Sequence, residues 1–102
     1  MPTRSNEHLC KLAQAGDTAA RDILLENNLG FIRKIALEQY RSMGLDENDI
    51  GIDVDDLVQE GSIGLLNAIP LFDAGRDMKF LTYAAPAIRN AMTDCIRAAL
   101  AQ

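Results

Sequence analysis

The sequence predicts an all-α fold, a compact bundle of about five helices, from three observations. Apolar residues recur every three or four positions rather than every second one, which is the period of an amphipathic helix. The β-branched residues are scattered, so the short runs typical of strands are nearly absent. Glycine, proline and capping side chains divide the 102 residues into segments of helical length.

The first three helices are separated by short polar breaks. A helix is predicted over residues 7–15, and Gly16 ends it because glycine tolerates the left-handed backbone that follows many helices. Asp17 is placed to cap a second helix over residues 18–26, since its carboxylate can accept a free amide hydrogen at the helix start. A third, longer helix is predicted over residues 29–42.

The last two helices are each marked by a proline. Asp53 and an acidic first turn favour the start of a helix over residues 54–69, and Pro70, which lacks an amide hydrogen, predicts its end or a kink. A long final helix is predicted from around residue 80 to near the C-terminus. Pro86 then falls in its opening turns, where the missing donor costs least if the helix starts near residue 82.

Composition limits the chain to one domain of a globular type. With 102 residues, 48% hydrophobic and 25% charged, we expect a single domain over residues 1–102. No apolar run approaches the roughly 20 residues of a membrane-spanning helix, and the polar start lacks a signal peptide, so a soluble cytoplasmic protein is expected. Cys10, Cys95 and His8 have no metal-ligand spacing, and no cofactor or metal is expected.

Charge is distributed unevenly along the chain. The net charge of -5 argues against generic nucleic-acid binding, which normally needs a basic surface. Every charge in residues 46–60 is negative, whereas cations outnumber acids from Arg76 onward. One end is therefore suited to a basic protein surface and the other to DNA, although a solvated acidic loop explains residues 46–55 equally well.

The predicted helix over residues 54–69 has one apolar face and one mixed face. Helical spacing places six residues inward: Val54, Leu57, Val58, Gly61, Leu65 and Ala68. Gly61 and Gly64 are expected to let another helix approach closely. The outward side collects Asp55 or Asp56, Gln59, Ser62, Ile63 and Leu66. Aliphatic side chains among polar ones are more typical of a docking surface than of a purely solvated face. Ordinary burial of those aliphatics is the alternative.

The final helix divides in the same way. Its inward stripe is predicted to be Ala84, Ile88, Ala91, Met92, Cys95 and Ala99, and its outward side Thr82, Pro86, Arg89, Asn90, Thr93 and Arg97. Lys79, Phe80 and Tyr83 place two aromatic rings beside a cation, a combination that suits single-stranded nucleic acid. Composition alone favours the other interpretation, in which both rings are core residues that seal the helix start.

Two chemical functions are not supported by the residues. Residues 46–57 begin like a calcium-binding loop, but Ile50 and Leu57 occupy positions that need oxygen ligands. No nucleophile lies next to a base, and there is no glycine-rich phosphate loop. We therefore expect neither a calcium site nor an enzyme.

Two motifs carry a resemblance to a known family. Asp-Leu-Val-Gln-Glu-Gly over residues 56–61 and Lys-Phe-Leu-Thr-Tyr-Ala over residues 79–84, with Phe-Asp at 72–73 between them, closely resemble region 2 of the sigma-70 family. The resemblance covers nearly the whole chain, with residues 1–27 as preceding helices and residues 28–102 as the conserved core.

The resemblance implies two macromolecular partners and no cofactor. The first motif helix of the family docks on core RNA polymerase, at a coiled coil of the β′ subunit, and the matching residues here are Asp56, Gln59, Glu60, Ser62 and Leu66. An anti-sigma factor is a further partner that the family allows. The domain is expected to contribute binding and no chemistry of its own.

The second partner implied is promoter DNA, through the non-template strand of the minus-ten element. Phe80 and Tyr83 would stack on flipped bases, with Thr82 between them. The phosphate contacts would come from Arg76, Lys79 and Arg89, and the upstream edge of the element would be read by Asn90 and Thr93.

Some residues depart from the family pattern. Housekeeping members carry a tryptophan pair where this chain has Pro86 and Ala87, which resembles stress and sporulation sigma factors and indicates an alternative factor. The chain also has an acidic insertion at residues 45–54 and no helix-turn-helix domain. A polymerase-binding regulator or decoy that no longer opens promoters is the competing hypothesis.

Overall fold

The computed structural model describes residues 4–47 and 50–101, and over these residues the protein is all-α, as predicted. Its elements are α1 (Asn6–Gln14), α2 (Thr18–Asn27), α3 (Leu29–Ser42), α4 (Val54–Ala68), the short 3-10 helix η1 (Ile69–Leu71) and α5 (Phe80–Leu100). Asn48 and Asp49, which belong to the predicted acidic loop, lie outside the described residues.

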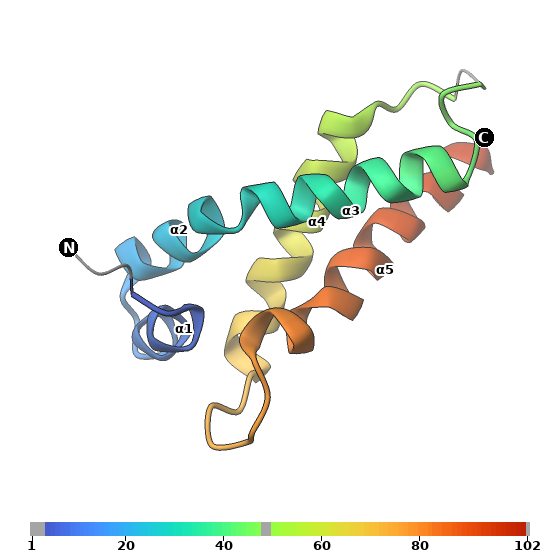
Figure 1. Cartoon of the computed structure of the whole chain (residues 1–102). Coiled ribbons are helices and arrows are strands. Elements are labelled where there is room, and N and C mark those ends of the chain that lie inside the picture. Colours follow the sequence, from blue (N-terminus) through green and yellow to red (C-terminus); the bar gives the residue numbers. More distant parts are fainter. Residues whose placement is uncertain (1–3, 48–49, 102) are drawn as a thin grey trace.

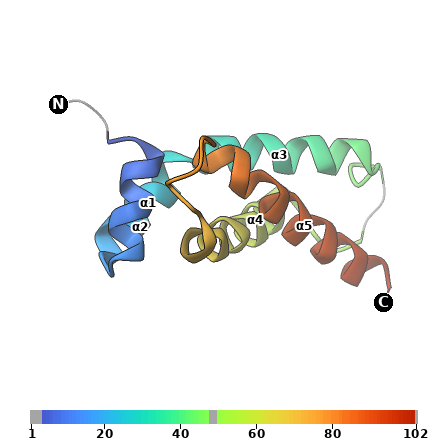
Figure 2. The same ribbon diagram turned by 90° about the horizontal axis from the view of Figure 1, so that it is seen from below.

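The helices form an elongated bundle with extents of 42 × 27 × 23 Å. α4 and α5 run in opposite directions and make the most extensive contact in the described part of the chain, and α3 crosses over α4 (Figure 1). α1 and α2 lie together at one end, opposite the end of α5 (Figure 2). The segment between η1 and α5 stands out from the bundle at the bottom of Figure 1.

Local capping side chains explain where the helices begin. The Ser5 hydroxyl and an Asp17 carboxylate oxygen each accept an amide hydrogen from the first turn that follows, at 3.0 Å. Asp53 and Asp56 form a reciprocal capping box, with both hydrogen bonds at 2.9 Å. Gly16 has φ +102°, which confirms the left-handed position predicted after α1.

All five α-helices contribute to one hydrophobic core. Its largest fully buried side chains are Phe80, Leu9, Leu24, Ile32, Ile35, Leu57, Leu65, Ile88, Met92, Ile96 and Cys10. Asn28 is the buried polar residue among the described ones, 6% exposed, and its amide nitrogen donates to Asn6 Oδ1 and to the Leu24 carbonyl at 2.8 and 2.7 Å. A buried amide is tolerated there because its hydrogen bonds are made.

Two glycines allow α4 to approach α5 closely. A β-carbon built on Gly64 would lie 2.6 Å from the Ala87 carbonyl oxygen and 3.1 Å from Ile88 Cα. A β-carbon on Gly61 would collide with the Met92 side chain. The prediction that both glycines permit a close helix approach is therefore confirmed, and any larger residue at position 64 meets backbone.

The final helix begins at Phe80, as predicted, rather than near Thr82, so Pro86 is its seventh residue and the hydrogen bond to the Thr82 carbonyl is lost. Its buried side follows every fourth residue, which brings in Ile96 in place of the half-buried Cys95. Ala91 and Ala99, also predicted inward, are half-buried as well.

Candidate functional site

Fewer residues on the outward side of α4 are exposed than the sequence predicted. Gln59 is exposed and Ile63 is 50% exposed, so an aliphatic side chain lies beside an amide on open surface. Asp55 is also exposed and pairs with Arg33 of α3, with Nη1 to Oδ1 at 3.1 Å. This group, Asp55, Gln59 and Ile63, is called the α4 ridge below. Ile63 is absent from the residues that the family resemblance implied, and helical spacing is the signal that identifies it.

The other predicted polymerase contacts flank the α4 ridge. Asp56 and Glu60 are half-buried toward α5, where both charges, together with the larger effect of burial, raise the pKa of the Cys95 thiol. Asp56 is also engaged in the capping box. Asp56 therefore serves the start of α4, and both carboxylates lie close enough to Cys95 of α5 to influence its thiol.

Ser62 and Leu66 lie on the opposite flank and are both half-buried. The Ser62 hydroxyl donates to the Val58 carbonyl at 2.7 Å. Leu66 packs against the core and lines a hollow of about 430 Å³ together with residues of α1 and α2, including Gln14 and Arg21. Leu66 is therefore less exposed than predicted, because it packs against the core and faces the hollow beside α1 and α2.

A second hollow, of about 540 Å³, lies between the end of α4 and the first turns of α5. We call it the apolar hollow. Its lining residues are Asn67, Ala68, Leu71, Met78, Thr82, Tyr83, Pro86, Ala87 and Asn90. It joins three of the predicted DNA contacts, Thr82, Tyr83 and Asn90, to Asn67 and Leu71 from the other side of the hollow.

Exposed apolar residues form the mouth of the apolar hollow. Leu71 is 72% exposed and Met78 is 46% exposed. The same two residues and Tyr83 also border an adjoining hollow of about 350 Å³ that contains Asp73 and Arg76. Leu71 and Met78 were not among the predicted site residues. The signal that could have identified them is an apolar residue at each end of the polar turn around Gly75.

The two predicted stacking residues differ in accessibility. Phe80 is 0% exposed and makes an edge contact with Phe72, with ring centroids 5.4 Å apart at 88°. It is a core residue here, so the expectation that it stacks on a base is not supported. Tyr83 is half-buried and lies 5.6 Å from Phe72 at 54°, and its ring also borders the apolar hollow.

The predicted phosphate contacts are all exposed. Arg76 lies 3.6 Å from the Asp73 carboxylate, Nε to Oδ2, and this pair is open to solvent. Lys79 precedes α5 directly and Arg89 lies nearly three turns further along it. Arg76 borders the adjoining hollow, and Lys79 and Arg89 are sequence neighbours of Met78 and Asn90, which line the apolar hollow. None of these three cations lines the apolar hollow itself.

Thr93 does not share the environment of Asn90. Asn90 lines the apolar hollow, but Thr93 is half-buried against α3, with its hydroxyl 2.9 Å from the Arg89 carbonyl and 3.2 Å from Gln39 Oε1. Gln39 Nε2 in turn donates to the Arg89 carbonyl at 3.1 Å. The predicted outward position of Thr93 is therefore wrong, because α3 packs against that side of α5.

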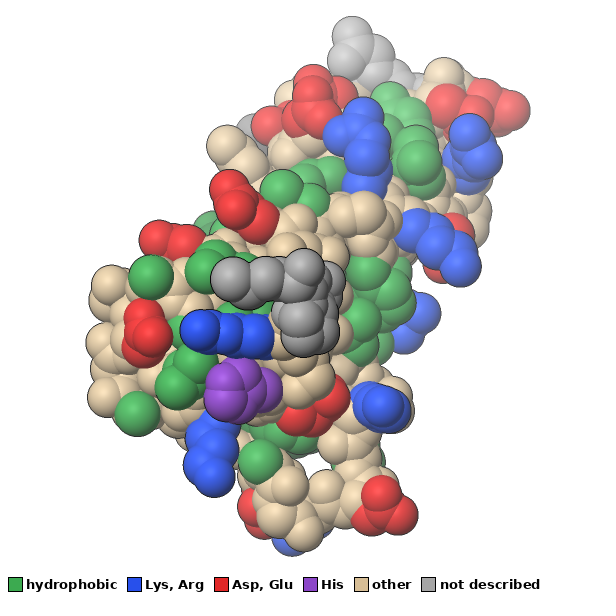
Figure 3. Space-filling model, turned by 60° about the vertical axis from the view of Figure 1, so that its left-hand side comes forward, with side chains coloured by type: hydrophobic (Ala, Val, Ile, Leu, Met, Phe, Trp, Pro, Cys, Tyr) green, Lys and Arg blue, Asp and Glu red, His purple; other side chains and the backbone are tan. Residues whose placement is uncertain are grey.

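Acidic and basic side chains are interspersed on the surface that α1 and α2 present (Figure 3).

Within residues 4–47 and 50–101, no three histidine, cysteine or acidic side chains are grouped as a metal site would require. None of the helices described is long and apolar enough to cross a membrane.

Comparison with known proteins gives a consistent result. The family model described as Sigma-70 region 2 matches residues 24–100. The RNA polymerase sigma-C factor of Myxococcus xanthus is 39% identical over 90 residues, covering 88% of this chain and 28% of that protein. The sigma-F and sigma-G factors of Bacillus subtilis are 35% and 36% identical, covering 89% and 86% of this chain. This chain spans 32% of the length of each of these two relatives.

Proposed function

We propose a function on the premise that this chain belongs to the sigma-70 region 2 family and is of the alternative type. The function is to dock on core RNA polymerase and to recognise and help open the minus-ten element of a promoter. The domain would act by binding alone and would catalyse no reaction. The observation that carries this proposal is the apolar hollow, which has an aromatic wall and exposed cations nearby.

The apolar hollow suits an unpaired nucleobase. The ring of Tyr83 offers a stacking surface, and the amides of Asn67 and Asn90 supply both donors and acceptors for a base edge. Extruding a base from a duplex costs a few kcal/mol, which stacking and backbone contacts would offset. Lys79 and Arg89, which are both exposed, would follow the phosphates of the bound strand.

The hollow depends on small residues at two positions. Pro86 and Ala87 line it where housekeeping members of the family carry a tryptophan pair, according to the resemblance described above. With no bulky wedge at these positions, promoter opening by this chain would rely on capture of a base that has already left the duplex. Strand separation should therefore need more help from the promoter sequence itself.

The α4 ridge is the proposed contact with the β′ coiled coil of polymerase. Ile63 provides an exposed aliphatic anchor, and Gln59 and the acidic start of α4 surround it. Such a mixed patch is typical of protein interfaces. The acidic side chains would meet basic residues on the partner, which favours fast association.

The DNA-binding half is tested by Tyr83→Ala in the complex with polymerase. The parent complex should prefer a single-stranded non-template oligonucleotide to a scrambled one and to the duplex. Because stacking contributes roughly 1–3 kcal/mol per base, Tyr83→Ala should weaken binding about five- to a hundredfold, and binding should fall with added salt. Tyr40→Ala is the matched control, since Tyr40 is also half-buried but lies on α3, outside the apolar hollow.

The docking half is tested separately with Gln59→Ala plus Ile63→Ala. This variant should weaken capture of the β′ subunit while the helical circular dichroism stays unchanged. Ile23→Ala, on α2 and 42% exposed, is the control for loss of an exposed aliphatic side chain. Equal capture by both variants would remove the α4 ridge from the proposal. If polymerase binds but promoter sequence is not distinguished, the chain is a polymerase-binding decoy.

A further inference from the structure

The connecting segment, residues 72–79, carries several groups that the proposed function uses, yet its own contacts with the bundle are few. Residues 73–79 are all exposed. Their hydrogen bonds are local, such as Gly75 N to Asp73 Oδ1 at 2.9 Å and Met78 N to the Arg76 carbonyl at 2.9 Å. The segment projects at the bottom of Figure 3. Its placement must therefore come from its two ends.

The beginning of the segment is held by Gln14, at the C-terminal end of α1. Gln14 Nε2 donates to the Ile69 carbonyl at 2.8 Å and to the Phe72 carbonyl at 2.7 Å. An amide nitrogen has two hydrogens, and both are used here. Cys10, one turn earlier on α1, places its thiol 3.7 Å from the same Ile69 carbonyl.

The end of the segment is held by Glu7, at the N-terminal end of α1. Glu7 Oε2 accepts a hydrogen bond from the Phe80 amide at 2.8 Å, across 73 residues of sequence. Lys79, the residue before α5, makes no side-chain capping bond of its own. Glu7 therefore supplies a cap from another helix, and its negative charge suits the positive end of the α5 dipole.

We propose that α1 is a clamp on the connecting segment, with Glu7 and Gln14 as positioning residues that set the affinity for unpaired promoter bases. The clamp rests on the proposed function, because its consequence is measured as DNA binding. Arg76, Met78 and Lys79 lie between the two points that α1 holds. Fixing both points before DNA arrives reduces the ordering that binding must otherwise supply.

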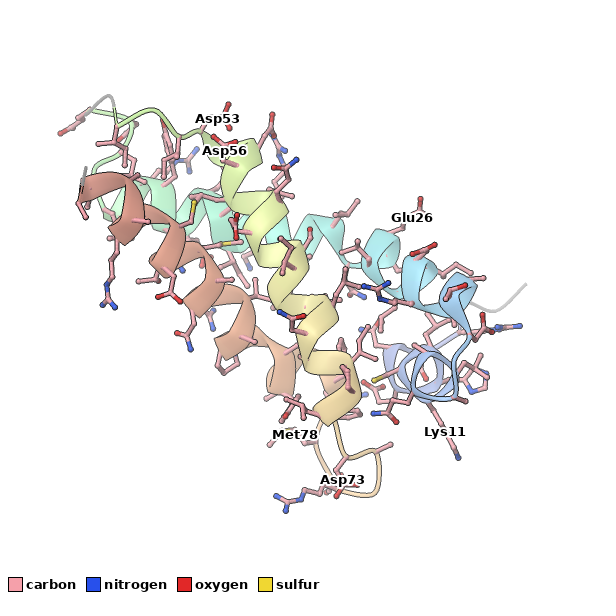
Figure 4. All side chains as sticks on the ribbon, turned by 180° about the vertical axis from the view of Figure 1, so that it is seen from behind. Lys11, Glu26, Asp53, Asp56, Asp73 and Met78 are labelled. Atoms are coloured by element: carbon pink, nitrogen blue, oxygen red, sulfur yellow. The ribbon has the colours of Figure 1, made fainter. Side chains whose placement is uncertain are left out.

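The experiment uses the full chain with core polymerase and three variants, Glu7→Ala, Gln14→Ala and Glu7→Gln. Lys11→Ala is the control on the exposed side of α1, and Glu26→Ala controls for loss of an acid on α2 (Figure 4). Amide hydrogen exchange is measured over residues 72–82 and in the core of α3 and α4. Affinity for the single-stranded oligonucleotide and for polymerase is measured in parallel.

Glu7→Ala and Gln14→Ala should each raise exchange over residues 72–82 selectively and weaken oligonucleotide binding about three- to tenfold, which is the range expected for one or two hydrogen bonds. Polymerase affinity should not change. Glu7→Gln keeps an acceptor oxygen for the Phe80 amide and should bind closer to the parent than Glu7→Ala does. A purely structural role would lower the melting temperature without this selective pattern.

Where the parent complex selects single-stranded promoter sequence, either of two results would overturn the clamp. One is that oligonucleotide affinity in Glu7→Ala and Gln14→Ala falls no further than in Lys11→Ala. The other is that amide exchange rises equally in the core and in residues 72–82. If the parent complex does not select single-stranded promoter sequence, the proposed function has failed. Exchange then decides the clamp separately, because unchanged exchange over residues 72–82 overturns it and a selective rise in both alanine variants supports it.

Discussion

The two proposed binding surfaces of this protein are held in place in different ways. The α4 ridge is part of a regular helix that is packed against α5 through two glycines, so its residues are positioned by backbone geometry. The connecting segment and the apolar hollow depend on side-chain hydrogen bonds from α1 and on a few aromatic contacts. A docking surface built on a packed helix should tolerate substitution elsewhere, whereas the hollow should respond to changes on a distant helix.

The largest expected effect comes from the glycine contact beneath the α4 ridge. Gly64→Ala would place a β-carbon against the Ala87 carbonyl oxygen, and backbone cannot move aside as a flexible side chain would. We expect the free energy of unfolding to fall by about 2–4 kcal/mol, measured by urea denaturation.

Gly30→Ala is the matched control for that substitution. Gly30 is also helical, but a β-carbon there meets nothing within 4 Å. Alanine is the better helix former by up to about 1 kcal/mol, so this variant should be neutral or slightly more stable. Equal losses in the two variants would contradict the view that close packing of α4 on α5 fixes the ridge.

A smaller loss of folding stability is expected at high pH, and it comes from the Cys10 thiol on α1. Burial and, secondarily, Glu7 raise the pKa of the Cys10 thiol from 9.0 to about 11. Between these values the unfolded chain loses the proton while the folded chain keeps it, so stability present below pH 9 declines as pH rises toward 11. At pH 10.5 the loss should be about 2 kcal/mol relative to pH 8.

Cys10→Ala provides the comparison for this pH effect. The variant should be less stable at pH 8 because it leaves a small cavity, but its stability should decline less between pH 8 and 10.5 than that of the parent. Tyrosine and lysine side chains titrate in both proteins, so their contribution cancels in the difference. Parallel pH profiles would show that the Cys10 thiol does not resist ionisation in the folded protein.

The elements that local sequence determines were predicted well. The capping side chains of α1, α2 and α4 bond to amides within three residues, and Gly16 acts on its own backbone, so short-range reasoning was enough to bound these helices. The same reasoning placed Gly61 and Gly64 at a helix contact, because their helical spacing with Leu57 and Leu65 is visible in the sequence.

Features that depend on distant segments could not be read in this way. Glu7 reaches Phe80 across 73 residues, and no local pattern distinguishes it from an ordinary solvated acid. Phe80 and Tyr83 share one motif, yet only the first is fully buried, since Phe72 and α1 close over it. Leu66 and Thr93 were predicted to point outward, but both are half-buried, Leu66 in the hollow beside α1 and α2 and Thr93 against α3. The orientation of the helices relative to one another decides each of these cases.

The smallest expected effect concerns the ion pair between Arg33 and Asp55 at the edge of the α4 ridge. Its nitrogen and oxygen are 3.1 Å apart, but the two side chains are 56% and 79% exposed, so water screens their attraction and ordering them costs entropy. A double-mutant cycle with Arg33→Ala and Asp55→Ala should give a coupling below about 0.5 kcal/mol, which 0.5 M salt should remove. Folding would then make little use of the Asp55 charge, leaving it available to a basic partner. A coupling above about 1 kcal/mol would mean that Asp55 helps to hold α3 against α4. The α4 ridge would then also depend on a side-chain interaction, as the apolar hollow does, and the difference between the two surfaces would be smaller at that position.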